Sequence, residues 1–243
     1  KQVKGKVQEQ WGKLTDDEKK DLARLSQFQQ RRQTREERKA RLAELRQKET
    51  DGKLTPDEII AMMKRGNERF RSGKGTAQNV LAQQRASAKG QFPAAVILSC
   101  IDSRAPADTI MDLGIGDVFN ARVAGNIAND DILGSMEFAC AAAGAKVVLV
   151  MGHTACGAIA GAIDDVKLGN LTGLLARIQP AVKAAAYQGD RSAKNSAFVD
   201  AVARKNVELT MESIQKGSPV LNELKAKGAI NIVGAMYDIQ SAK

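Results

Sequence analysis

The sequence contains a single histidine, three cysteines and few aromatic residues among its 243 positions. One histidine excludes every site that requires two, such as three-histidine zinc centres, Cys2His2 zinc fingers and HExxH metalloproteases. An odd number of cysteines without short regular spacing argues against a disulfide scaffold and favours a reducing compartment. Because aromatic residues make up only 4% of the chain, Ala, Val, Ile and Leu must form most of the core.

Long hydrophobic runs are also missing. The longest apolar stretch, over residues 138–152, is interrupted by Lys146 and is shorter than the ~20 residues that a transmembrane helix needs. No signal peptide is visible. We therefore expect a protein without a membrane span that is located in the cytoplasm, or in the periplasm if a leader has been removed.

Negative charge is scarce at the front of the chain. The formal net charge is +9, and residues 1–50 hold 15 Lys and Arg against 9 Asp and Glu. Such a segment could attract nucleic acid or an anionic membrane, but a solvated helix with many charge pairs explains the same composition. We therefore expect no nucleic-acid partner. The capping-box pattern from Thr15 to Glu18 predicts a helix here, and the stretch 4–14 resembles the start of CsbD-type bacterial stress proteins.

The remainder of the chain has the pattern of an α/β domain. Strands are expected at 94–98, 117–123, 146–151 and 230–237, and segments with helical patterns separate them. The expected strands at 94–98 and 146–151 contain short apolar runs, which are typical of buried strands. These helices include one that begins after Thr55, one at 155–163 and one at 174–187. Strands that alternate with helices predict a mainly parallel central sheet flanked by helices. We expect a basic helical N-terminal extension over 1–50 and an α/β domain over 51–243.

Potential metal ligands follow two of these strands. Cys100 follows the strand expected at 94–98, and His153 and Cys156 follow the strand expected at 146–151. The carboxyl ends of parallel strands meet at one edge of the sheet, where ligands bind. Two thiolates and an imidazole are typical ligands of zinc, so the sequence predicts a zinc site at this edge.

Asp102 is the candidate fourth ligand, because it lies two residues after Cys100. It can instead pair with Arg104, whose guanidinium suits bidentate binding of a carboxylate. If Asp102 pairs with Arg104, the fourth zinc position is left to water, which is the pattern of catalytic zinc sites. Asp102 would then accept a hydrogen bond from the zinc-bound hydroxide.

These motifs resemble those of the β-class carbonic anhydrases over residues 55–238. The resemblance rests on Cys100-x-Asp102-Ser103-Arg104, on the motif at 122–126 (Arg-x-Ala-Gly-Asn), and on His153-x-x-Cys156-Gly157. It implies reversible hydration of carbon dioxide to bicarbonate and a proton by zinc-bound hydroxide.

The resemblance also assigns roles to individual residues. It implies that Cys100, His153 and Cys156 bind Zn2+ and that Asp102 and Arg104 form a catalytic pair that controls the fourth ligand position. It further implies substrate-binding roles for three residues: Gln91, Phe119 and Gly157. Phe138 stands where some members have a pocket tyrosine. The resemblance implies a homodimer, or a larger assembly of dimers, with pockets that use both chains.

Two alternatives remain open from the sequence. The same zinc site could hydrolyse carbonyl sulfide or carbon disulfide, because the width of the pocket decides the substrate. The chain could also be a zinc-stabilised binding module whose basic arm is the functional part, which predicts salt-sensitive binding of nucleic acid. The Asp102–Arg104 motif argues against this module, because a purely structural zinc site does not require a controlled fourth position.

Overall fold

A computed structural model of the chain describes residues 54–76, 78–88 and 90–243. It contains one four-stranded sheet in the order β2-β1-β3-β4, and each neighbouring pair of strands is parallel. The strands are β1 (Ala95–Ser99), β2 (Val118–Arg122), β3 (Val147–His153) and β4 (Asn231–Tyr237). The four predicted strands and their mainly parallel arrangement are thus confirmed.

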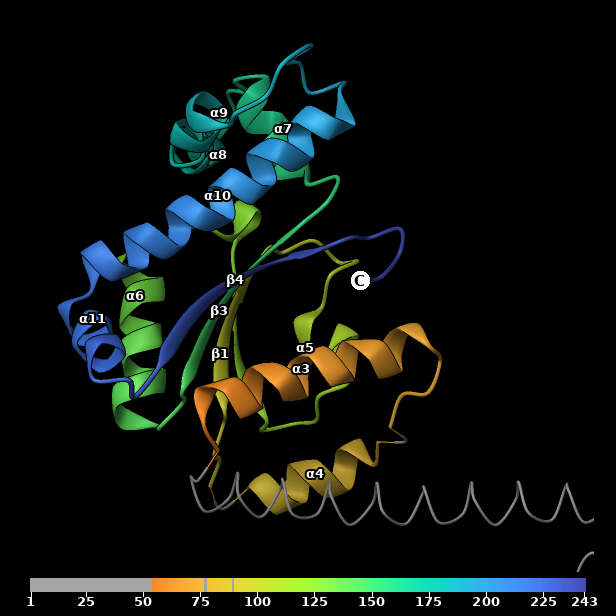
Figure 1. Cartoon of the computed structure of the whole chain (residues 1–243), viewed down its shortest axis with the longest axis vertical. Helices are drawn as coiled ribbons and strands as arrows, with labels where there is room; N and C mark the ends of the chain where they lie inside the picture. The colour runs from red at the N-terminus through yellow and green to blue at the C-terminus, as the bar shows by residue number, and fades with distance from the viewer. Residues whose placement is uncertain (1–53, 77, 89) are drawn as a thin grey trace, which may run out of the picture. The chain divides into compact units, whose positions relative to one another are not determined.

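Helices cover both faces of the sheet (Figure 1). The helices are α3 (Pro56–Arg71), α4 (Val80–Ser87), α5 (Ala107–Ile110), α6 (Asp130–Glu137), α7 (Gly157–Ile163), α8 (Gly169–Ala176), α9 (Gln179–Ala184), α10 (Ser196–Gly217) and α11 (Pro219–Ala226). A 3-10 turn, η1 (Ala124–Asn126), follows β2, and a π-helical segment, η2 (Phe138–Ala142), extends α6. Helix α10 packs on β3 and β4, whereas α3 and α5 lie on the opposite face.

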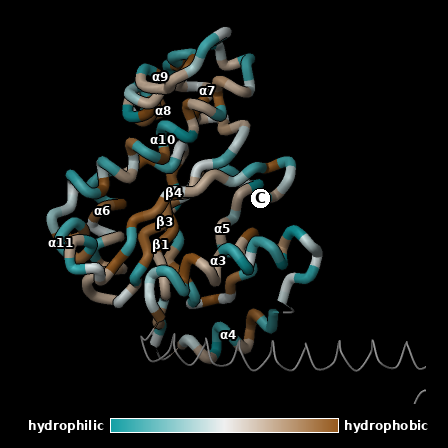
Figure 2. Tube along the Cα trace, viewed as in Figure 1, coloured by the Kyte–Doolittle hydropathy of each residue, from teal (hydrophilic) through white to brown (hydrophobic). Residues whose placement is uncertain are grey.

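The central strands form the apolar core. Every residue of β1 and β3 is buried, and these strands are among the most hydrophobic segments of the chain (Figure 2). Strands that are buried on both faces show continuous apolar runs rather than alternation, as expected for a parallel sheet. This core fixes the ends of β1 and β3, from which the candidate metal ligands project.

The start of α3 follows the sequence prediction. Thr55 is the N-cap, its side chain accepts a hydrogen bond from the Glu58 amide, and the Glu58 carboxylate accepts one from the Thr55 amide. This reciprocal capping satisfies backbone donors that the first helical turn leaves free.

Two helix predictions need correction. The prediction of a single helix at 174–187 is wrong. The segment contains the end of α8 and all of α9, and the two helices are separated by a break before Gln179. Pro180 causes the break, since proline has no amide hydrogen and is accepted only in a first turn. The helix expected at 155–163 begins only at Gly157, because Ala155 has a left-handed backbone (φ 52°).

No helix within the described ranges is long and apolar enough to cross a membrane. The extension expected over 1–50, including its capping box and its CsbD-like start, lies outside the residues that the structure describes.

Candidate metal centre

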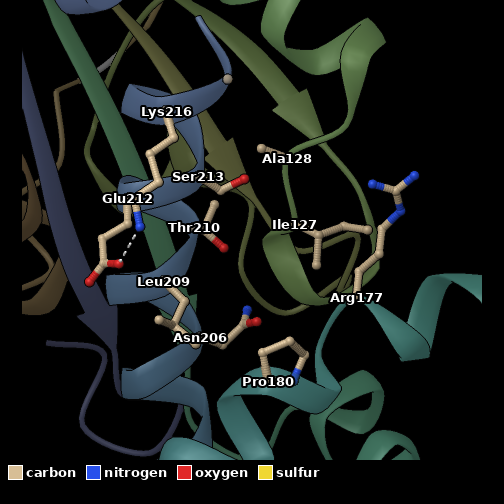
Figure 3. A pocket seen from close by; sticks show the side chains of 11 residues that line it. Ile127, Ala128, Arg177, Pro180, Asn206, Leu209, Thr210, Glu212, Ser213 and Lys216 are labelled. Carbon is tan, nitrogen blue, oxygen red and sulfur yellow. Dashed lines mark hydrogen bonds and ion pairs between the residues drawn. The ribbon is translucent and has the colours of Figure 1, made fainter.

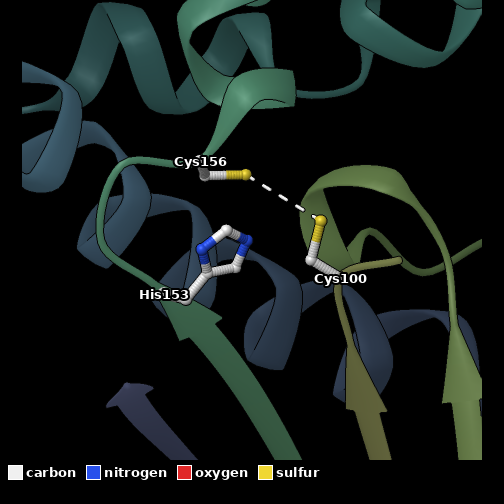
Figure 4. Close-up of side chains that lie close together, drawn as sticks. All are labelled: Cys100, His153 and Cys156. Carbon is white, nitrogen blue, oxygen red and sulfur yellow. Dashed lines mark hydrogen bonds between the residues drawn. The ribbon is translucent and has the colours of Figure 1, made fainter. Parts of the chain in front are cut away.

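Cys100, His153 and Cys156 converge at the carboxyl edge of the sheet (Figure 4). Cys100 follows β1, His153 ends β3, and Cys156 is the residue before α7. Their potential ligand atoms all lie within 4.8 Å of one another, and all three residues are buried. Because β1 and β3 are paired in register up to Ser99 and Met151, the sheet itself brings these side chains together, as the sequence predicted.

The Nε2 atom of His153 is available to bind a metal ion. Nδ1 of His153 lies 2.9 Å from the carbonyl oxygen of Thr154. A carbonyl can only accept, so Nδ1 carries the hydrogen in the neutral ring and Nε2 keeps its lone pair. Nε2 is buried and has no hydrogen-bond partner among the described residues. A buried polar atom without a partner is costly, and a metal ion would satisfy it.

The spacing of the two sulfur atoms also fits zinc. The Sγ atoms of Cys100 and Cys156 lie 3.9 Å apart and form no disulfide. Two sulfurs at the usual Zn–S distance of about 2.3 Å in a tetrahedral site would be about 3.8 Å apart. The residues therefore fit a zinc ion.

The environment of the two thiols favours a thiolate. The contact between the two thiols lowers the pKa of Cys100 and raises the pKa of Cys156. Cys100 Sγ also accepts a hydrogen bond from the Gly125 amide at 3.4 Å. The pKa of His153 is raised although burial lowers it, because Cys100 and the Thr154 carbonyl favour the protonated ring. Since metal ligands must be deprotonated, binding a cation here releases protons.

Asp102 pairs with Arg104 through both carboxylate oxygens. Nε of Arg104 donates to Oδ1 at 2.9 Å and Nη2 donates to Oδ2 at 2.8 Å. The Arg104 amide adds a bond of 2.9 Å to Oδ1. The hydrogen bond from the Arg104 side chain is the largest of the effects that lower the pKa of Asp102 to about 2. Asp102 is thus an ionised acceptor, and its Oδ2 lies 3.9 Å from Nε2 of His153.

A second arginine holds the loop that carries Cys100 and Asp102. Nε of Arg122 donates to the carbonyl oxygen of Cys100 at 3.0 Å, and its Nη2 donates to the carbonyl oxygen of Asp102 at 2.6 Å. Arg122 is the first residue of the motif at 122–126 that the sequence analysis singled out. The motif was recognisable in the sequence, but its contacts with the Cys100 loop were not.

The expected substrate residues do not all lie near these ligands within one chain. Gly157 directly follows Cys156 and is the first residue of α7. Gln91 is exposed and precedes β1, whereas Cys100 follows it, so the two residues lie at opposite ends of the strand. Phe119 pairs with Val96 in β1, near the start of that strand. A single chain therefore brings Gly157, but neither Gln91 nor Phe119, to the ligand cluster.

Comparisons with known proteins agree with this geometry. Residues 95–243 match the family model described as carbonic anhydrase. "Carbonic anhydrase 2" of Mycobacterium tuberculosis is 33% identical over 187 residues, which cover 74% of this chain and 87% of that protein. One of two tetrameric β-carbonic anhydrases of Sordaria macrospora has a similar crystal structure, with a TM-score of 0.58 and 28% identity, covering 65% of this chain and 82% of that chain.

A carbon disulfide hydrolase of Acidithiobacillus thiooxidans is also similar, but only over 77 residues, or 29% of this chain. The carbonic anhydrases thus match much more of the chain. Together with the α/β sheet and the buried Cys–His–Cys cluster at its carboxyl edge, these similarities lead to one conclusion: the chain belongs to the β-carbonic anhydrase family.

Proposed function

We propose that this chain is a zinc-dependent carbonic anhydrase in which Cys100, His153 and Cys156 bind the zinc ion. The activity is the reversible hydration of carbon dioxide to bicarbonate and a proton. The observation that carries the proposal is the buried cluster, in which two sulfurs 3.9 Å apart face an imidazole nitrogen that has no hydrogen-bond partner in the described part of the chain. Zinc would supply a Lewis acid that makes a water molecule acidic near neutral pH.

In this proposal Asp102 and Arg104 control the approach to the cluster. Arg104 holds the Asp102 carboxylate by two side-chain hydrogen bonds, which keeps it from acting as a fourth ligand. The ionised carboxylate can only accept hydrogen bonds. Oδ2 of Asp102 therefore accepts a hydrogen bond from an O–H donor and orients that donor beside the cluster. No second histidine is present in the sequence, so water and external buffer are the remaining carriers that remove the proton.

We also propose that the substrate pocket is completed by a second copy of the chain. Gln91 and Phe119 precede or lie early in their strands, away from the ligand cluster of their own chain. In a homodimer they would reach the partner's cluster, while Gly157 contributes its amide from the same chain. We assign this catalytic domain to residues 51–243 and treat 1–50 as an extension outside it.

Hydrolysis of carbonyl sulfide or carbon disulfide is the less supported alternative. The similarity to a carbon disulfide hydrolase covers 29% of the chain, against 74% for a carbonic anhydrase. Turnover of carbon dioxide and carbon disulfide by the same preparation compares the two substrates directly.

Replacing Cys100 tests the zinc assignment. In the variant Cys100→Ser we expect loss of stoichiometric zinc and of carbon dioxide hydration, because a neutral hydroxyl replaces a thiolate ligand. Metal analysis of the purified protein and stopped-flow hydration kinetics measure the two effects.

Cys140→Ala is the matched control, since Cys140 is also buried but lies outside the cluster. Burial raises the pKa of the Cys140 thiol to about 12, so it stays a neutral core residue. We expect this control to keep zinc and activity. A Cys100→Ser variant that hydrates carbon dioxide as fast as the unmodified chain would rule out the assignment.

A further inference from the structure

Helix α10 contacts the loop that carries two of the proposed zinc ligands, and also the turn whose amide donates to the third, although none of those ligands belongs to the helix. Asp200 in its first half binds the loop between His153 and Cys156, and Asn206 near its middle binds the turn η1 after β2. The two contacts span 45 and 81 positions of sequence. They are therefore made only in the folded domain.

Asp200 holds a strained residue of the ligand loop. Its Oδ1 accepts a hydrogen bond from the Ala155 amide at 3.1 Å. Ala155 has φ 52°, in the left-handed region, which is unfavourable for an alanine. Strain of this kind persists only where the surroundings enforce it, and it is frequent at functional sites. The Asp200 carboxylate is one of the groups that enforce it.

The same alanine also binds the proposed catalytic pair. The carbonyl oxygen of Ala155 accepts a hydrogen bond from Nη2 of Arg104 at 3.3 Å, and Nη2 also donates to Asp102. A continuous path thus runs from Asp200 through Ala155 to Arg104 and on to the Asp102 carboxylate. Moving Ala155 would move the carbonyl that helps to place the guanidinium.

Asn206 holds the turn η1, whose Gly125 amide lies against Cys100. It is 3% exposed, and its Nδ2 donates to the carbonyl oxygen of Gly125 at 2.7 Å. The amide of Gly125 in turn donates to Cys100 Sγ. Figure 3 shows Asn206 on α10 beside the segment with Ile127 and Ala128, where these residues border a cavity of about 570 Å3. Asn206 therefore fixes the peptide that donates to one sulfur of the cluster.

We propose that Asp200 and Asn206 are positioning residues with separate effects on the zinc site. Asp200 places Arg104 and, through it, Asp102, so it acts on turnover. Asn206 places the Gly125 amide against Cys100, so it acts on metal affinity. This inference rests on the proposed function, because it takes Asp102 and Arg104 as the catalytic pair and Cys100 as a ligand.

Variants of Asp200 in the full-length zinc protein test its role in positioning Arg104 and Asp102. We expect Asp200→Ala to lower kcat per bound zinc about 10- to 100-fold, because small displacements of catalytic groups have effects of this size. Zinc affinity, measured by competition with a chelator, stays within about threefold, since no ligand contact is lost. Asp200→Asn keeps an acceptor oxygen, so its kcat stays within about threefold of the unmodified enzyme.

Variants of Asn206 test its role in positioning the Gly125 amide, with a readout other than activity. We expect Asn206→Leu to weaken zinc binding about 10- to 100-fold, as is usual when a group that orients a ligand is removed. The visible spectrum of the cobalt-substituted protein shifts as well, because the thiolate of Cys100 loses the fixed amide. If this variant does not fold, Asn206→Ser serves instead, because serine is too short to reach the Gly125 carbonyl.

The outcomes separate this inference from the proposed function. Unchanged kcat per zinc in Asp200→Ala overturns the role of Asp200, and so does an Asp200→Asn variant as slow as Asp200→Ala. If Asp200 and Asn206 have purely structural roles, Asp200→Ala and Asn206→Leu lower the melting temperature, but turnover per zinc stays normal and the cobalt spectrum is unaltered. The proposed function fails in a different way, namely if the unmodified chain binds no zinc or does not hydrate carbon dioxide.

Discussion

At the scale of single residues, the structure separates the residues that would bind the metal from the residue that would orient an O–H donor. Asp102 lies 3.9 Å from Nε2 of His153 but is tied to Arg104 on both oxygens. In the variant Asp102→Asn we expect zinc content to be unchanged and kcat to fall about 100-fold or more, because a neutral amide lacks the negative charge that orients an O–H donor beside the cluster. Metal analysis and stopped-flow kinetics on the same sample measure both quantities.

The matched change is Arg104→Lys, which keeps the positive charge but cannot form the two-bond pairing with the carboxylate. We expect it to retain zinc and to lose activity to a smaller extent than Asp102→Asn. Loss of zinc in Asp102→Asn would show that Asp102 is a ligand rather than the partner of Arg104.

The sequence predicted the three metal ligands because each one lies close to a strand end and forms part of a short motif. Cys100, His153 and Cys156 could therefore be located without a structure, and the structure brings them together. The contacts of Asp200 and Asn206 could not be predicted, since both residues look like ordinary polar positions of a long helix. Their partners are backbone groups at distant positions, and side-chain patterns carry no information on such contacts.

At the scale of elements, α3 is attached to the sheet domain by an ion pair at its end. Arg69 of α3 binds Asp112, which follows α5, and the two side chains are only 15% and 7% exposed. Thr76 adds two hydrogen bonds to the Asp112 carboxylate. Although burial raises the pKa of Asp112, the bonds from Arg69 and Thr76 outweigh it and hold the pKa below its usual value.

This pairing predicts a dependence of stability on pH. Because the pKa of Asp112 is lower in the folded than in the unfolded chain, its contribution to stability is present above about pH 4 and is lost as the pH falls through the folded value. We expect Asp112→Asn to destabilise the metal-free protein by about 1–3 kcal/mol at pH 7. The difference from the unmodified chain should shrink toward pH 3, as measured by urea unfolding.

Asn is the suitable replacement because Asp112 has φ 50°, and asparagine tolerates this left-handed conformation. Glu223→Gln provides the control, since Glu223 forms an exposed pair with Lys227 and such pairs contribute little. A loss of stability in Asp112→Asn that persists unchanged at pH 3 would assign the effect to packing rather than to charge.

The sequence was most informative where elements are buried. The buried strands β1 and β3 and the N-cap of α3 were predicted from continuous apolar runs and a capping box, which are local signals. The partly exposed strands β2 and β4 were predicted as well. The prediction failed between 174 and 187, where apolar periodicity continues across Pro180 and conceals the break between α8 and α9. The late start of α7 could not be predicted either, since tertiary contacts impose the left-handed conformation of Ala155.

At the scale of the whole molecule, the edge of the sheet formed by β2 carries an aromatic group, here meaning the contacting side chains of Phe119 and Phe138, and Phe138 is exposed. Phe138 is 58% exposed and packs edge-to-face against Phe119, with ring centroids 6.1 Å apart. Phe92, just before β1, is 60% exposed. Aromatic residues are rare in this chain, and exposed ones are enriched at interfaces between proteins. We infer that this group is buried by a second copy, which would also bring Gln91 and Phe119 to the partner's zinc site.

Introducing a charge into this aromatic group tests the assembly. We expect Phe138→Asp to shift the protein to monomers in sedimentation velocity, because a carboxylate would have to be buried without a partner. Each monomer should keep its zinc, since the three ligands come from one chain, while hydration activity falls about 100-fold or more because orientation at the site is lost. Leu168→Asp is the control, because Leu168 is 66% exposed but lies before α8, away from β2. A monomeric Phe138→Asp variant with full activity would show that one chain is sufficient for catalysis and that Gln91 and Phe119 have no role in the partner's pocket.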